Sequence, residues 1–86
     1  MSHLVPLHHL KPGQRAEVVE LRSDSHARLA RLGALGLMPG SWLVVLQVKP
    51  AVVLRVGETE LSLDHAVAGE ILVRPEPGGR RAPGSA

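Results

Sequence analysis

The stretch that decides the fold is WLVVLQVKPAVVLRVGETELSL, residues 42–63. It holds three runs that are rich in apolar residues, at 42–49, 52–56 and 59–63. Lys49-Pro50-Ala51 interrupts the chain after the first run, and Gly57-Glu58 separates the second run from the third. Short runs rich in Val and Leu and bounded by Pro or Gly are typical of β-strands. The glycine at 57 between the second and third runs is a hairpin signal. The segment therefore predicts three consecutive antiparallel strands.

Upstream of this segment, residues 14–22 predict another strand. Ala16, Val18, Val19 and Leu21 are apolar and charged residues lie between them. The Val18-Val19 doublet breaks strict alternation, which predicts either a β-bulge or a strand that is buried on both sides near its end.

A helix is predicted over residues 26–35, between these strands. Candidate N-caps precede it in the Ser-Asp-Ser of 23–25, and Gly36 suits the left-handed residue that ends a helix. Leu29 and Leu32 form a short apolar stripe. Gly33 inside the helix costs about 1 kcal/mol relative to Ala, so we expect close backbone packing there.

A helical turn at 64–69 and a short strand at 70–74 complete the pattern. The strands follow one another too closely for parallel crossovers. We therefore predict a mainly β fold, a small SH3-like five-stranded barrel with one α-helix after the first strand and a short helical turn before the last. Residues 1–74 form this domain, and 75–86 are expected to be a disordered Pro/Gly/Arg tail.

Composition restricts the functions open to the chain. With 86 residues there is room for one domain. There is no cysteine, which excludes disulfides and thiolate metal sites. Basic and acidic residues balance through residue 73, and Trp42 is the only aromatic residue. A nucleic-acid partner is therefore not expected, because phosphate binding needs clustered cations and single strands need stacking platforms.

The N-terminus lacks a basic leader followed by an apolar run, and no apolar stretch is long enough to span a bilayer. We expect a cytoplasmic protein that does not insert into membranes. Ser62, Asp64 and His65 are the residue types of a hydrolase triad, but residues so close in sequence seldom converge in space. No phosphate loop or dinucleotide motif is present, so we expect no enzyme.

Histidines supply the only candidate metal ligands. His3, His8 and His9 could hold a divalent ion such as Fe2+ or Zn2+ weakly, which would make the chain a metal carrier or sensor. The alternative, which we favour, is an exposed pair that picks up metal opportunistically, with no cofactor required. His26 and His65 are interpreted as surface or capping residues.

The turn after the helix supplies a candidate protein-binding surface. Leu37 is expected to plug the end of the barrel. Met38 with Arg28 and Arg31 either forms a pliable apolar contact surface or is only part of a turn in which Pro39-Gly40 reverses the chain. Trp42 is expected to be a core plug, although Trp is also a favoured interface anchor.

The order of motifs resembles the FeoA family (ferrous iron transport protein A). The resemblance covers about residues 4–74. It rests on LHHLKPG at 7–13, RLARL at 28–32, LGLMPG at 35–40, the Val-rich strand before Pro50, DHAVA at 64–68 and ILV at 71–73.

This resemblance implies an SH3-like FeoA domain in the cytoplasm. It would be an accessory protein of ferrous iron uptake that binds the GTP-using cytosolic part of a FeoB-like membrane permease. A homo-oligomer is compatible with this role. The surface that we assign to partner binding consists of Arg28, Arg31, Leu35, Leu37, Met38 and Pro39.

Overall fold

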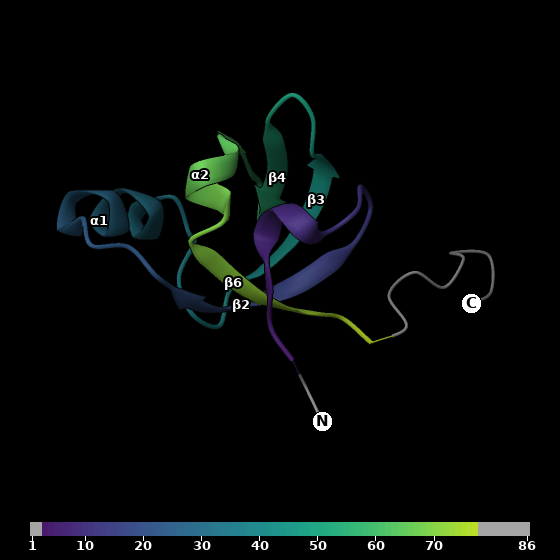
Figure 1. Ribbon diagram of the computed structural model, residues 1–86, viewed down its shortest axis with the longest axis horizontal. Helices are drawn as coiled ribbons and strands as arrows, with labels where there is room; N and C mark the ends of the chain where they lie inside the picture. Colours follow the sequence, from purple (N-terminus) through teal and green to yellow (C-terminus); the bar gives the residue numbers. More distant parts are fainter. Residues whose placement is uncertain (1–2, 78–86) are drawn as a thin grey trace.

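Six antiparallel strands form one curved sheet in the computed structural model, which describes residues 3–77 (Figure 1). The strands are β1 (Val5–Pro6), β2 (Arg15–Leu21), β3 (Trp42–Gln47), β4 (Val52–Val56), β5 (Thr59–Leu63) and β6 (Ile71–Pro75). The helices are η1 (Leu7–His9, a 3-10 helix), α1 (His26–Ala34) and α2 (His65–Ala68). The mainly β, SH3-like architecture is confirmed.

The strand order is β1-β6-β2-β3-β4-β5, so β1 and β5 form the two edges of a partly open barrel. Five strands were predicted. The sixth is β1, where Val5 pairs with Val73 and Pro6 with Leu72. Two residues are too few to show strand periodicity, which is why the sequence pattern missed it.

Strand β2 carries the predicted bulge. Its register against β6 shifts between Val18 and Glu20, as the Val18-Val19 doublet indicated. A bulge increases the local twist, and here it lies in the strand that pairs with both β3 and β6.

The core is entirely aliphatic, and no polar or charged residue among 3–77 is buried. Leu37 is fully buried, as expected of a plug at the end of the barrel. The expectation for Trp42 was wrong, because 43% of its surface is exposed. Leu43 and Val45 face the core, so Trp42 and Val44 must face outward on a strand whose side chains alternate.

Helix α1 projects from one side of the barrel and buries only Leu32 (Figure 1). The expectation of close packing at Gly33 was wrong, since a Cβ added there would meet nothing within 4 Å.

The last strand ends one residue later than the predicted 70–74. Strand β6 runs to Pro75, and the Glu76 amide donates to the Arg15 carbonyl (2.9 Å). The remainder of the predicted tail, from residue 78, lies outside the described residues. No helix among residues 3–77 has the length and apolar character needed to cross a membrane.

Candidate protein-binding site

The end of α1 is a Schellman motif. The Leu37 amide donates to the Leu32 carbonyl and the Gly36 amide to the Gly33 carbonyl, both at 2.9 Å. Gly36 has a φ of 101°, which L side chains rarely adopt, and a Cβ there would lie 3.2 Å from Val56 Cγ1. Glycine is therefore required both by the backbone and by the neighbouring hairpin.

The turn that follows α1 is fixed to strand β2. The Gly40 amide donates to the Val18 carbonyl, and the Val18 amide donates to the Ser41 carbonyl, each at 2.8 Å. The Ser41 hydroxyl donates to the Gly36 carbonyl at 2.6 Å. These hydrogen bonds hold the backbone that carries Met38 in one conformation.

Apolar side chains are exposed on this turn. Leu35 is 38% exposed and Met38 is 48% exposed, and Pro39 beside them is also exposed. We call Arg31, Leu35, Met38 and Pro39 the helix-to-turn surface. Leu37 belongs to the core instead, so its part in any binding is to anchor the turn.

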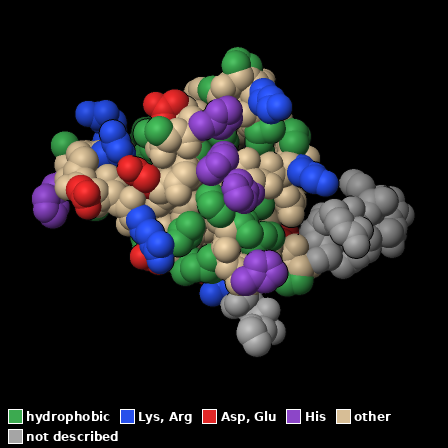
Figure 2. Space-filling view, in the orientation of Figure 1, with side chains coloured by type: hydrophobic (Ala, Val, Ile, Leu, Met, Phe, Trp, Pro, Cys, Tyr) green, Lys and Arg blue, Asp and Glu red, His purple; other side chains and the backbone are tan. Residues whose placement is uncertain are grey.

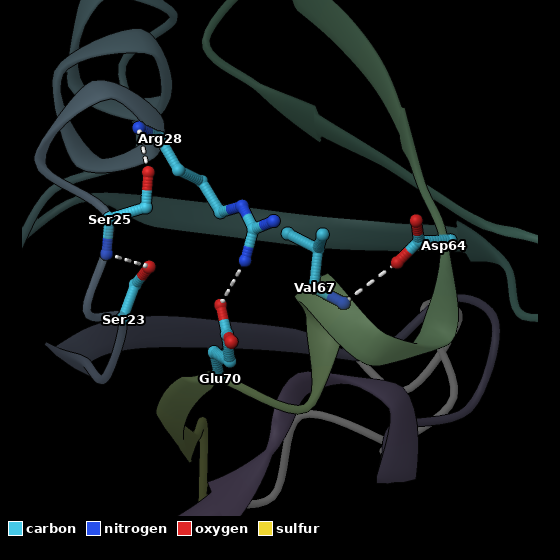
Figure 3. Close-up of polar contacts among 6 residues, drawn as sticks. All are labelled: Ser23, Ser25, Arg28, Asp64, Val67 and Glu70. Carbon is cyan, nitrogen blue, oxygen red and sulfur yellow. Dashed lines mark hydrogen bonds and ion pairs between the residues drawn. The ribbon is translucent and has the colours of Figure 1, made fainter.

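The two arginines of α1 differ in their contacts. Arg28 Nη1 lies 3.0 Å from Glu70 Oε1, at the start of β6 (Figure 3). The Arg28 amide donates to the Ser25 hydroxyl, the N-cap of α1, at 3.1 Å. Arg28 therefore ties the helix to the barrel. Arg31 is exposed and makes no ion pair within the described part of the chain. Sequence reasoning missed Glu70, because it is 42 residues away from its partner.

The triad residue types serve local structure. Asp64 Oδ1 accepts a hydrogen bond from the Val67 amide at 2.8 Å and caps α2 (Figure 3). His65 Nε2 donates to the Val48 carbonyl at 2.7 Å, and Ser62 is exposed on β5. Asp64 and His65 are thus used in local hydrogen bonds, and the absence of catalysis stays a prediction.

Several histidine side chains lie near one another on one face of the barrel, and another lies apart on the side of α1 (Figure 2). The rings of His8 and His9 have centroids 4.6 Å apart, and the His65 ring lies 6.0 Å from His8. No pattern in the sequence indicated that His65 would lie near them. His3 is exposed. Within residues 3–77, no group of three or more His, Asp or Glu side chains is arranged to hold a metal ion. The metal site at His3, His8 and His9 stays a prediction.

His8 is the member of this cluster that is packed against the barrel. Its Nδ1 is buried without a hydrogen-bond partner, and its Cε1 lies 3.4 Å from where a Cβ on Gly69 would be. Burial, together with repulsion from His9 and His65, lowers the pKa of His8 below its ordinary value of 6.5.

The helix-to-turn surface is therefore apolar, lies on a turn that backbone hydrogen bonds hold in place, and has the cation of Arg31 at its edge. The FeoA domain family model matches residues 5–75. This chain belongs to the FeoA domain family. No curated protein sequence gives a significant match to this FeoA domain.

Solved structures of other FeoA proteins share its fold. The crystal structure of an iron uptake regulatory protein (FeoA) is 29% identical, with a TM-score of 0.77, over 86% of this chain and 100% of that one. The solution structure of the FeoA protein from Chlorobium tepidum is 30% identical, with a TM-score of 0.76, over 93% of this chain and 82% of that one. The zinc complex of Stenotrophomonas maltophilia FeoA, an SH3 domain protein, is 24% identical, with a TM-score of 0.73, over 95% of this chain and 99% of that one.

Proposed function

We propose that this FeoA domain is a non-enzymatic, cytoplasmic accessory protein of bacterial ferrous iron uptake. It acts by binding the cytosolic, GTP-using part of a FeoB-like membrane permease through the helix-to-turn surface. Family membership supports the iron-uptake role, and one relative is described as an iron uptake regulatory protein.

The observation that carries the proposal is the exposure of Leu35 and Met38 on a turn that is hydrogen-bonded to β2. An apolar side chain held in place loses little conformational entropy when a partner covers it, so more of the burial energy appears as affinity. Met is suited to such a surface because its unbranched side chain adapts to the partner's shape.

Arg31 defines the chemistry expected of the partner. It lies one helical turn before Leu35, is exposed and has no ion pair within residues 3–77. A complementary surface would hold an apolar recess for Met38 and Leu35 and a carboxylate facing Arg31. Arg28 is a poorer probe, because its guanidinium already contacts Glu70.

The test is the affinity of the purified cytosolic part of the permease for variants of this chain, measured by titration calorimetry. Burying a Met side chain contributes about 1.5–3 kcal/mol, so Met38→Asp should weaken binding about tenfold or more. Arg31→Glu should weaken binding as well, because it turns an attraction into a repulsion.

Two controls match these changes. Leu4→Asp places the same charge on another exposed apolar residue, and Lys49→Glu reverses an exposed cation between β3 and β4. Both should bind as the unchanged protein does. If Met38→Asp and Arg31→Glu bind with unchanged affinity while remaining folded, the helix-to-turn surface is not the binding site.

A further inference from the structure

A second surface lies on the outer face of the sheet, apart from the helix-to-turn surface. A shallow cavity of about 360 Å³ is lined there by Arg15, Trp42, Val44 and Arg55, which we call the outer-face groove. Leu43 and Gly57 complete the lining.

Strand register explains how the groove forms. Arg15 of β2 pairs with Val44 of β3, and Val44 pairs with Arg55 of β4. The three residues therefore form one row across three strands. Because neighbouring strands lie about 4.8 Å apart, the two arginines begin about 10 Å from each other, with Val44 as an apolar floor between them.

Trp42 forms one end of the groove. It is 43% exposed, and the guanidinium carbon of Arg15 lies 5.4 Å from the ring centroid. Gly57 leaves this end open, because it has no side chain to fill the space. An exposed indole beside two guanidinium groups combines an apolar contact with two directional donors for carboxylates.

The charged side chains that line the groove are positive. None of the residues 3–77 that line it is acidic. The carboxylates nearest to the two arginines stand outside it: Glu76 Oε1 is 3.5 Å from Arg15 Nε, and Glu60 Oε1 is 3.9 Å from Arg55 Nη2. Both arginine side chains are more than half exposed. Exposed pairs at such distances contribute little, so carboxylates of a ligand can replace them.

We propose that the outer-face groove binds an extended, acidic segment of a partner protein. Two carboxylates on alternate residues contact Arg15 and Arg55, and an apolar or prolyl side chain two residues beyond them, on the same side of the extended segment, packs on Trp42 beside Val44. Alternate side chains of an extended chain are about 7 Å apart, and the long arginine side chains span the remaining distance.

Charge and shape favour this occupant over other anions. A single phosphate leaves the indole uncovered. A single strand of nucleic acid would find one stacking position only, because the chain has one Trp and no Tyr or Phe. The sequence after residue 77 carries Arg80 and Arg81 but no acidic residue, so this tail lacks the charge that the groove requires.

Trp42 makes the test direct, because the chain has no other Trp and no Tyr or Phe. The probe is the end-capped peptide acetyl-Glu-Ser-Glu-Ser-Leu-amide, in which the two Glu and the Leu lie on one side of the extended chain, titrated while Trp42 emission is followed. A saturable change is expected. Loss of one charge-assisted contact should weaken binding about tenfold, both in Arg55→Gln and in Arg15→Gln.

The controls separate this groove from general charge and from the proposed function. Arg22→Gln removes an exposed arginine outside the groove and should bind the peptide as the unchanged protein does. Met38→Asp should also leave peptide binding unchanged, so failure of the permease interaction and failure of this proposal are distinguishable. Circular dichroism checks that each variant is folded.

Several results would overturn the proposal. One is no saturable change with the acidic peptide at millimolar concentration, and another is an equal response to the peptide with Gln in place of Glu. Tighter binding of a single-stranded oligonucleotide would indicate a nucleic-acid site, and an equal response to inorganic phosphate a general anion site. Emission that depends on protein concentration, with a dimer in sedimentation, would assign the groove to a second copy of the chain.

Discussion

Gly36, Leu37 and Met38 are consecutive residues that have three different structural roles. Gly36 adopts the left-handed conformation that ends α1, Leu37 is fully buried, and Met38 is nearly half exposed. The first two roles follow from the sequence, since a glycine after an apolar stripe predicts a C-cap and the next Leu predicts a core contact. The exposure of Met38 did not follow, because it depends on how the turn is fixed to β2.

Trp42 shows what sequence pattern cannot determine. The run from Trp42 to Leu46 is apolar at every position, so it has no polar alternation from which to read the inward face. The face is set by the pairing of β3 with β2 and β4, which places Leu43 and Val45 in the core. The groove that contains Trp42 was missed for this reason.

His8 gives a prediction about pH at the scale of one residue. Its pKa is lower in the folded protein than its ordinary 6.5, so the unfolded chain binds more protons between the two values. The stability contribution is therefore complete above about pH 6.5 and is lost as the pH falls through the folded pKa. We expect the fall in Tm between pH 8 and pH 5 to be smaller in His8→Gln than in the unchanged protein.

The matched control for His8 is His26→Gln. His26 is exposed at the first residue of α1, and neither ring contact of His8 involves it. The His26→Gln variant measures how much of the effect is common to any His-to-Gln substitution outside the cluster. If Tm depends on pH equally in His8→Gln and in the unchanged protein, the packing of the His8 ring does not couple its protonation to folding.

At the scale of elements, the helix and the longer strands were predicted to within a residue or two, because each has a run of apolar residues with a cap or a turn signal. Strand β1 was not, because it forms by pairing with β6, which lies far away in the sequence. The Arg28–Glu70 contact and the approach of His65 to His8 likewise join segments that are distant in the sequence.

The two glycines near the end of α1 give opposite predictions. Gly33→Ala should stabilise the protein by up to about 1 kcal/mol, because Ala favours helix and a Cβ meets nothing there. Gly36→Ala should destabilise it by about 1–2 kcal/mol, because the left-handed conformation is costly for residues with a Cβ. Urea unfolding followed by Trp42 emission measures both. Equal effects of the two substitutions would contradict the Schellman account.

At the scale of the whole molecule, the barrel separates a fully aliphatic interior from two exposed surfaces that differ in character. The helix-to-turn surface is apolar with one free cation in the described part of the chain, and the outer-face groove holds two arginines around an indole. Each lies on backbone that the sheet holds in place: the turn is bonded to β2, and the groove is built on three paired strands. A molecule of this kind is suited to recognition.

The most direct test of the central claim is an NMR titration of the 15N-labelled chain with the unlabelled cytosolic part of the permease. The account predicts that the largest amide shift changes fall on residues 31–41, where Arg31, Leu35 and Met38 are exposed. Changes concentrated instead around His8, His9 and His65, or no changes at saturating partner concentration, would contradict it.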